Sequence, residues 1–218
     1  MRSAEERIKE LARAQSLDPA DAARLLDAVR PAPGERRGWL SNPFDRWSGE
    51  TTSLIGAVVA LAGLATSRMG VRYDGALDLH VVPQAVPIAV AVLDQLVAFV
   101  LTSVVLWGAA RCVSRARFVD VLGSVGLSRA PVVVVAVPLA LLVPLLPPDL
   151  TKPSAALLGI VVCSMVGVIG QIWLLVLGFR TATGCRGGRL ALSIIGGICV
   201  AELITKLALV LALVVVPR

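Results

Sequence analysis

Three ionisable side chains lie inside apolar stretches long enough to be membrane-spanning helices: Asp94, Glu202 and Lys206. A charge at the centre of such a helix costs about 2.5–3.5 kcal/mol on insertion scales. Glu202 and Lys206 stand four residues apart in the favourable order, so they are expected to pair along one helix face. Such groups could relay a proton or an ion, or contact a solute. We favour the simpler interpretation, a buried pair that fixes the register of neighbouring helices.

A second pattern consists of small residues that recur every four positions: Gly159, Cys163 and Gly167, followed at the same interval by Gln171. This spacing places them on one face of a helix, where small side chains let a second helix approach closely and Gln171 can hydrogen-bond across the contact. We expect this face to pack within the chain, and self-association is the alternative.

Other chemistry has little support in the sequence. The sole histidine, His80, lies beside Asp74 and Asp78 in a stretch expected to be a solvated loop. The four cysteines form no C-x-x-C pair, and phosphate-loop, serine-nucleophile and zinc motifs are not found. We therefore predict no catalytic residue, no cofactor and no metal site, and expect that the protein is not an enzyme.

The elements that carry these residues follow from hydropathy. The chain is 56% hydrophobic with a mean hydropathy of +0.82, and a membrane-spanning helix needs about 20 mostly apolar residues. Five stretches approach or exceed that length: 51–67, 86–110, 130–146, 154–179 and 190–216. The third contains Pro131, Pro138 and Pro144 and is expected to be kinked. The predicted fold class is an all-α membrane protein, a bundle of about five transmembrane helices with a small N-terminal helical segment, in contact with the lipid bilayer.

The N-terminal part is polar. Residues 1–38 predict a cytoplasmic segment of two short amphipathic helices, the second with Asp18 as its cap and Pro19 in its first position. Two such helices bury little area alone, so we expect them to pair with each other, with a second copy of the chain or with the membrane surface. Through this segment we predict binding to a protein partner or self-association. Residues 39–50 form a juxtamembrane linker whose aromatic side chains suit the headgroup layer, namely Trp39, Phe44 and Trp47.

The net charge of +6 does not predict nucleic-acid binding, because residues 1–50 hold nine basic and nine acidic side chains. The surplus lies in short loops. One group of arginines separates the second and third stretches (Arg111, Arg115, Arg117, Arg129) and another the fourth and fifth (Arg180, Arg186, Arg189). The remaining loops carry only Arg68 and Arg72, or Lys152. Basic loops face the cytoplasm, so we predict a cytoplasmic N-terminus and an outside C-terminus.

Residues 40–216 resemble the Yip1-domain membrane proteins. The similarity lies in the run from Phe118 through Gly123 and Gly126 to Pro131, and in the run from Trp173 through Gly178 to Gly184. The resemblance implies that residues 51–218 form a five-helix domain with a cytoplasmic N-terminus, and it brings no catalytic residue. Residues 1–33 are similar to short bacterial SHOCT-like segments, through 16–29, which implies oligomerisation or protein interaction. The Ala-, Arg-, Gly- and Val-rich composition is typical of a GC-rich bacterial genome and so of an inner membrane.

Two functions follow as hypotheses. The first is a non-enzymatic scaffold or adaptor of the Yip1-like class that presents its N-terminal segment to cytoplasmic partners. The alternative is a transporter or channel-like component that uses Asp94, Glu202 and Lys206.

Overall fold

The computed structural model describes residues 4–14, 16–29, 42–73, 75–82, 84–146 and 154–215. The predictions that concern Trp39, Asp74 and Lys152 fall outside these ranges. Contacts divide the chain into two compact units, Met1–Ser41 and Asn42–Arg218.

The first unit contains two helices, α1 (Ala4–Arg13) and α2 (Pro19–Val29), which pack on each other. The Asp18 side chain accepts a hydrogen bond of 2.7 Å from the backbone N–H of Ala20 and so caps the start of α2. Ile8 and Ala22 are buried between the helices, whereas Leu11 and Leu25 remain 50% and 44% exposed. The pair therefore leaves apolar surface uncovered.

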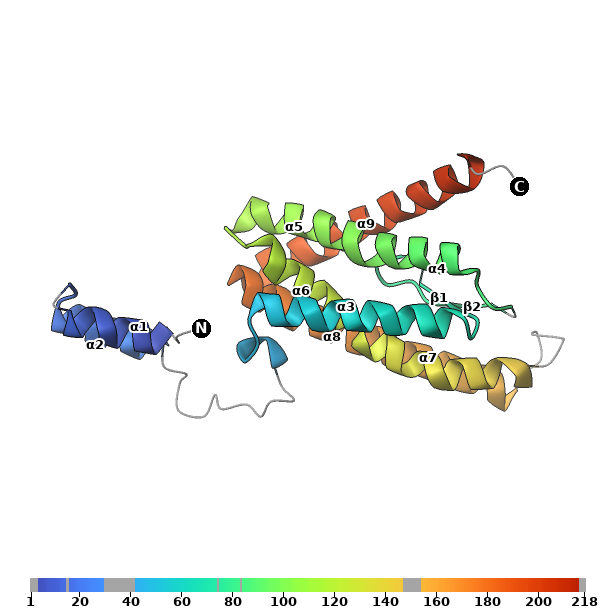
Figure 1. Cartoon of the computed structure of the whole chain (residues 1–218), viewed down its shortest axis with the longest axis horizontal. Coiled ribbons are helices and arrows are strands. Elements are labelled where there is room, and N and C mark those ends of the chain that lie inside the picture. Colours follow the sequence, from blue (N-terminus) through green and yellow to red (C-terminus); the bar gives the residue numbers. More distant parts are fainter. Residues whose placement is uncertain are drawn as a thin grey trace. The chain divides into compact units, whose positions relative to one another are not determined.

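The second unit is built from helices. Among the described residues, five segments are long and apolar enough to cross a membrane (Figure 1). In chain order they are α3 (Gly49–Ser67), then α4 (Ile88–Gln95) with the π-helix η2 (Leu96–Leu101) and α5 (Thr102–Val113), then α6 (Phe118–Ser128) with α7 (Ala130–Leu142) and the 3₁₀ turn η3 (Val143–Leu145), then α8 (Ala155–Thr183), and α9 (Gly187–Val215). A 3₁₀ turn, η1 (Pro43–Asp45), precedes α3.

The third span differs from its prediction. We expected it to begin at residue 130, but its helix begins at Phe118, so the loop before it is only Ser114–Arg117. Arg129 is therefore not a loop residue and lies buried inside the span. Pro131 has no N–H to donate to Leu127, four residues earlier, which explains why the helix is interrupted at Arg129 between α6 and α7.

Close helix contacts hold the bundle together at glycines. A Cβ added at Gly56 of α3 would lie 2.7 Å from the Cα of Gly126 of α6, and one added at Gly123 would lie 2.8 Å from the Thr52 Cβ. Such distances allow only glycine, so α3 and α6 touch backbone to backbone. The run of residues from Phe118 that resembles the Yip1-domain pattern is thus a packed helix rather than a loop.

Between the first two spans, the described residues 68–73, 75–82 and 84–87 fold back into the bundle, and we call this segment the re-entrant loop. It contains a short antiparallel pair of strands, β1 (Val71–Arg72) and β2 (His80–Val81). Figure 1 shows these strands between α4 and α7. Val71 and Tyr73 have no exposed surface and pack on Val132, Ala136 and Leu139 of α7. The expectation of a solvated loop is therefore wrong for this part of it, although His80 itself is exposed.

Candidate functional site

The four polar side chains predicted inside the spans all contact one element, the re-entrant loop. They come from three different spans, and each binds a different position between Arg72 and Asp78. The pairs are Asp94 with Arg72, Gln171 with Ala76, Glu202 with Leu77, and Lys206 with Asp78. The sequence identified the residues but not the loop that brings them together.

Asp94 makes the most buried of these contacts. Its two carboxylate oxygens accept from Nε and Nη2 of Arg72 at 2.9 and 3.0 Å, and the side chain has no exposed surface. A bidentate guanidinium–carboxylate pair is among the stronger protein hydrogen bonds. It fixes the start of the loop on α4 and neutralises a charge that would be costly alone.

Gln171 and Glu202 hold the middle of the loop by its backbone. Gln171 Nε2 donates to the carbonyl of Ala76 at 2.7 Å, and Glu202 Oε1 accepts from the N–H of Leu77 at 2.8 Å. The Glu202 carboxylate also lies against Gly75, where an added Cβ would be 2.5 Å from Oε2. These two side chains thus supply hydrogen-bond partners for the Ala76 carbonyl and the Leu77 N–H, which are backbone groups of the turn.

Lys206 and Glu202 do not form the predicted pair along the helix. Among described residues, the ion pair of Lys206 is with Asp78 Oδ2, and Asp78 Oδ1 lies 3.2 Å from His80 Nδ1. Both α9 side chains extend to the loop because the loop lies beside this helix face, an arrangement that helix periodicity cannot reveal.

Arg129 is a member of the site that sequence reasoning missed. Its Nη1 donates to the carbonyl of Ala98 in the π-helix η2 at 2.9 Å, and its guanidinium lies 5.6 Å from the centre of the Tyr73 ring. The Glu202 carboxylate attracts it electrostatically. A π-helix inside a span marks many functional sites. The only sequence signal was an arginine between two apolar runs, which positive-inside reasoning assigned to a loop.

Tyr73 closes the loop on α3. Its hydroxyl lies 2.6 Å from Thr66 Oγ1, and the side chain is fully buried. Burial raises the pKa of Tyr73 above its usual value, while the Thr66 hydrogen bond and the charge of Arg129 oppose this rise. The neutral phenol of Tyr73 therefore shares one hydrogen bond with Thr66, and the Arg129 guanidinium lies over its ring.

The contacts of the loop reach the middle depth of the bundle. At a rise of ~1.5 Å per residue, Arg129 lies ~16 Å from the start of α6, and Glu202 lies ~22 Å from the start of α9. Gln171 is near the centre of the 29-residue helix α8. The turn at residues 75–78 thus extends to the level where a membrane would be driest, and its polar groups are matched there by polar side chains.

The polar side chains of this site bind the re-entrant loop by hydrogen bonds and ion pairs. Among the described residues, no group of three or more His, Cys, Asp or Glu side chains could hold a metal ion. Two buried polar side chains have no hydrogen-bond partner in the described part of the chain: the Gln95 amide, which lies against Gly63, and the Thr102 hydroxyl.

The small-residue face of α8 packs on α7. A Cβ added at Gly167 would lie 2.6 Å from Val135 Cγ2, and one at Gly159 would lie 3.0 Å from Leu142 Cδ1. Cys163 belongs to the same apolar cluster. At the end of this row, the Gln171 amide hydrogen-bonds to the loop.

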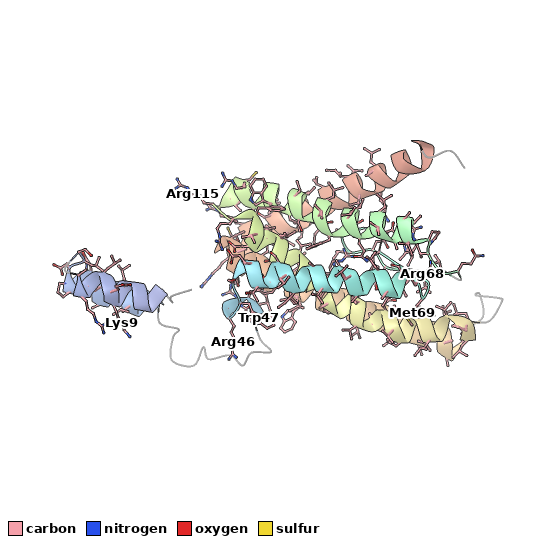
Figure 2. All side chains as sticks on the ribbon, in the orientation of Figure 1. Lys9, Arg46, Trp47, Arg68, Met69 and Arg115 are labelled. Carbon is pink, nitrogen blue, oxygen red and sulfur yellow. The ribbon has the colours of Figure 1, made fainter. Side chains whose placement is uncertain are left out.

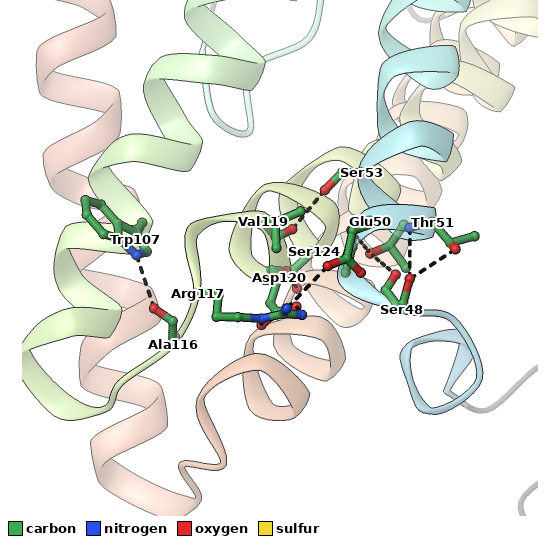
Figure 3. Close-up of polar contacts among 12 residues, drawn as sticks. Ser48, Glu50, Thr51, Ser53, Trp107, Ala116, Arg117, Val119, Asp120 and Ser124 are labelled. Carbon is green, nitrogen blue, oxygen red and sulfur yellow. Dashed lines mark hydrogen bonds and ion pairs between the residues drawn. The ribbon is translucent and has the colours of Figure 1, made fainter. Parts of the chain in front are cut away.

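The opposite end of the bundle, where α3, α6 and α9 begin, holds a different polar network (Figure 3). Arg117 bridges Asp120 at 2.8 Å and Glu50 at 3.3 Å, and both acids lie in first helical turns, where they complement the helix dipole. The pKa of Arg117 is raised by its hydrogen bonds to Asp120 and by the charge of that residue. Ser53 Oγ donates to the Val119 carbonyl, which ties α3 to α6.

A cavity of about 260 Å³ lies beside this network, between Trp47, Asp120 and Thr181. Trp47 and Arg46 project outward here, at the end of the bundle opposite Arg68 and Met69 (Figure 2). Phe44, predicted to lie in the headgroup layer, is instead buried against Gly178 of α8.

Comparisons of the chain with protein-family models, with curated proteins and with solved structures find no match.

Proposed function

We propose that this protein is a non-enzymatic membrane scaffold of the Yip1-like class, which holds its N-terminal helix pair at the cytoplasmic face for a protein partner. The observation that supports it most is the use of the intramembrane polar groups. Asp94, Gln171 and Glu202 each bind the re-entrant loop, so they stabilise the bundle.

The N-terminal unit supplies the binding part of the proposal. It forms a compact unit of its own, and Leu11 and Leu25 remain half exposed after α1 and α2 have packed. An exposed apolar surface on a small helix pair is characteristic of protein interaction sites. The basic turns at the end where α3 begins support a cytoplasmic orientation of that end at a bacterial inner membrane, and the proposal puts the N-terminal segment on the same side.

The test is affinity purification of the full chain from its native membranes, beside a variant that lacks residues 1–38. We expect protein partners that the deletion variant loses. The double variant Leu11→Glu with Leu25→Glu should lose them too, whereas Arg24→Ala, an exposed change on α2, should keep them. Recovery of only a second copy of the chain would indicate self-association, and equal recovery by the deletion variant would contradict the proposal.

The second candidate, a transporter or channel-like component, is favoured by the convergence of Arg129, Glu202 and the turn of the re-entrant loop at mid-depth. Intramembrane charges of this kind line many substrate and ion paths. Uptake assays in reconstituted vesicles separate the two candidates. A transporter loses its uptake activity with Glu202→Gln and keeps it when residues 1–38 are deleted. A scaffold keeps its protein partners with Glu202→Gln and loses them when residues 1–38 are deleted.

A further inference from the structure

The surface between α8 and α9 has a feature that the scaffold role does not use. The two helices leave an apolar groove of about 470 Å³ between them. Its walls are aliphatic side chains of both helices, and Leu77 of the re-entrant loop lies at its inner end. The main lining residues are Ile172, Val176, Leu190, Ile194, Ile198 and Leu77.

The length of the groove matches one membrane leaflet. It extends along α9 from Gly187 to Cys199, and at ~1.5 Å per residue this distance is ~18 Å. Half of a bilayer's hydrocarbon core is ~15 Å. An extended acyl chain anchored at the start of α9 would therefore reach Leu77 at the middle of the bundle.

The mouth of the groove is strongly basic. Arg180 lies in the last turn of α8, while Arg186 and Arg189 lie on either side of Gly187, and all three side chains are exposed. None of them forms an ion pair with a residue that the structure describes. Cβ atoms added at Gly187 and Gly188 would have no heavy atom within 4 Å, so the mouth is open.

The start of α9 is also electrostatically unusual. Its first turn contains no acidic residue and includes Arg189, although the positive end of a helix dipole favours anions and disfavours cations. A phosphate at this position would be attracted both by the arginines and by the backbone N–H groups of the first turn. The basic mouth favours an anionic headgroup and the apolar groove favours an acyl chain, and an anionic lipid has both.

We propose that the α8–α9 groove is a binding site for an anionic phospholipid of the leaflet at this end of the bundle. One acyl chain occupies the groove, and Arg186 and Arg189 hold the headgroup phosphate at its mouth. Basic pockets between transmembrane helices bind acidic headgroups in this manner. The occupant contacts Leu77, so it also supports the loop that Glu202 holds.

The test is native mass spectrometry of the full-length protein in detergent, titrated with palmitoyl-oleoyl phosphatidylglycerol or with phosphatidylcholine carrying the same chains. We expect phosphatidylglycerol to bind at least about tenfold more tightly. Each arginine near an anionic headgroup contributes about fivefold to the binding constant, so Arg186→Gln with Arg189→Gln should weaken the phosphatidylglycerol complex by about 25-fold.

The matched charge control is Arg46→Gln with Arg115→Gln. These two exposed arginines project at the same end of the bundle (Figure 2), but neither lines the groove. The control should bind phosphatidylglycerol as the unaltered protein does. An equal loss in the control would show general surface attraction and would overturn the proposal, as would equal binding of the two lipids by the unaltered protein.

The apolar half of the site has its own test. Ala191 is exposed and lines the groove, so Ala191→Trp should fill it and reduce the bound lipid at least fivefold. Ile195→Trp is a second variant of the same kind. Leu192→Trp changes a neighbouring residue that is 75% exposed and does not line the groove, and it should have no effect. Undiminished binding in both groove variants would place the lipid elsewhere.

Discussion

At one end of the bundle Arg72 binds Asp94, a carboxylate with no exposed surface, whereas at the other end Arg117 binds Glu50 and Asp120 with 55% of its own side chain exposed. Both are arginine–carboxylate contacts at about 3 Å. They differ in their exposure to water, so we expect burial rather than distance to decide how much each contact contributes to stability.

The two regions also depend on different sources of stability. The re-entrant loop is held by polar contacts to Asp94, Gln171 and Glu202. The opposite half is held by close glycine contacts between α3 and α6. There the exposed ion pairs are additions to a contact that packing has already made.

The largest effect is expected from Asp94→Asn. The change removes the charge from the buried carboxylate that binds Arg72, and removal of one partner of a buried pair destabilises proteins by about 3–5 kcal/mol. Unfolding in mixed detergent micelles, followed by circular dichroism, measures the loss. Arg72→Met with Asp94→Leu, which removes both charges, should recover much of it. A loss below about 1 kcal/mol for the single variant would show that the two ends do not differ.

Gly126→Leu should produce the next largest loss, now in the other region. The new side chain meets the Cα of Gly56 and the ring of Phe99, and overpacking of this kind costs about 1–3 kcal/mol or prevents folding. Gly108→Leu is the control, because a Cβ there has nothing within 4 Å. Equal stability of the two variants would mean that glycine contacts do not hold α3 on α6.

Glu202→Gln tests the middle of the loop. The amide oxygen can still accept from the N–H of Leu77, but the charge on the acceptor is lost, and the difference between charged and neutral hydrogen bonds is about 1 kcal/mol. The same unfolding experiment should show this smaller loss. Glu202→Leu removes the acceptor as well and should cost more. The reverse order would mean that the Leu77 contact does not stabilise the loop.

Tyr73 offers a pH-dependent test of the same region, since it is the only tyrosine in the chain. Burial raises its pKa above the usual value of 10.0, so the folded state holds the proton more tightly than the unfolded state. The stability from this difference is complete below about pH 10 and is lost as the pH rises through the folded pKa. The phenolate absorbance should titrate above pH 10 in the folded protein, and Tyr73→Phe should lose less stability at alkaline pH.

Hydropathy was sufficient to predict the five spans, because each apolar run is bounded by polar residues or prolines. The start of the third span was wrong, since Arg111, Arg115, Arg117 and Arg129 looked like one basic loop. The sequence does not distinguish an arginine that is buried against a carbonyl and an aromatic ring from an arginine that is exposed to solvent. Only the fold separates Arg129 from the rest.

The candidate site was predicted in part for a related reason. Asp94, Gln171, Glu202 and Lys206 are conspicuous because polar residues in apolar runs are rare. Their partners are not conspicuous: Arg72 and Asp78 lie in an ordinary polar loop, and Ala76 and Leu77 contribute backbone groups, which every residue has. The distance along the chain between partners, 125 residues for Leu77 and Glu202, also lies beyond any local pattern.

The smallest expected effect is that of Arg117→Gln, and it sets the lower end of the comparison. Exposed ion pairs contribute little to stability, because water screens the charges and ordering the side chains costs entropy. We expect the smallest loss of this series, and it should become smaller still as salt rises. The loss from Asp94→Asn should change little with salt, because buried charges are poorly screened. Unfolding at 0.05 and 0.5 M salt measures both. A large, salt-insensitive loss for Arg117→Gln would mean that this network is shielded from water, and the contrast between the two ends would then lie in packing alone.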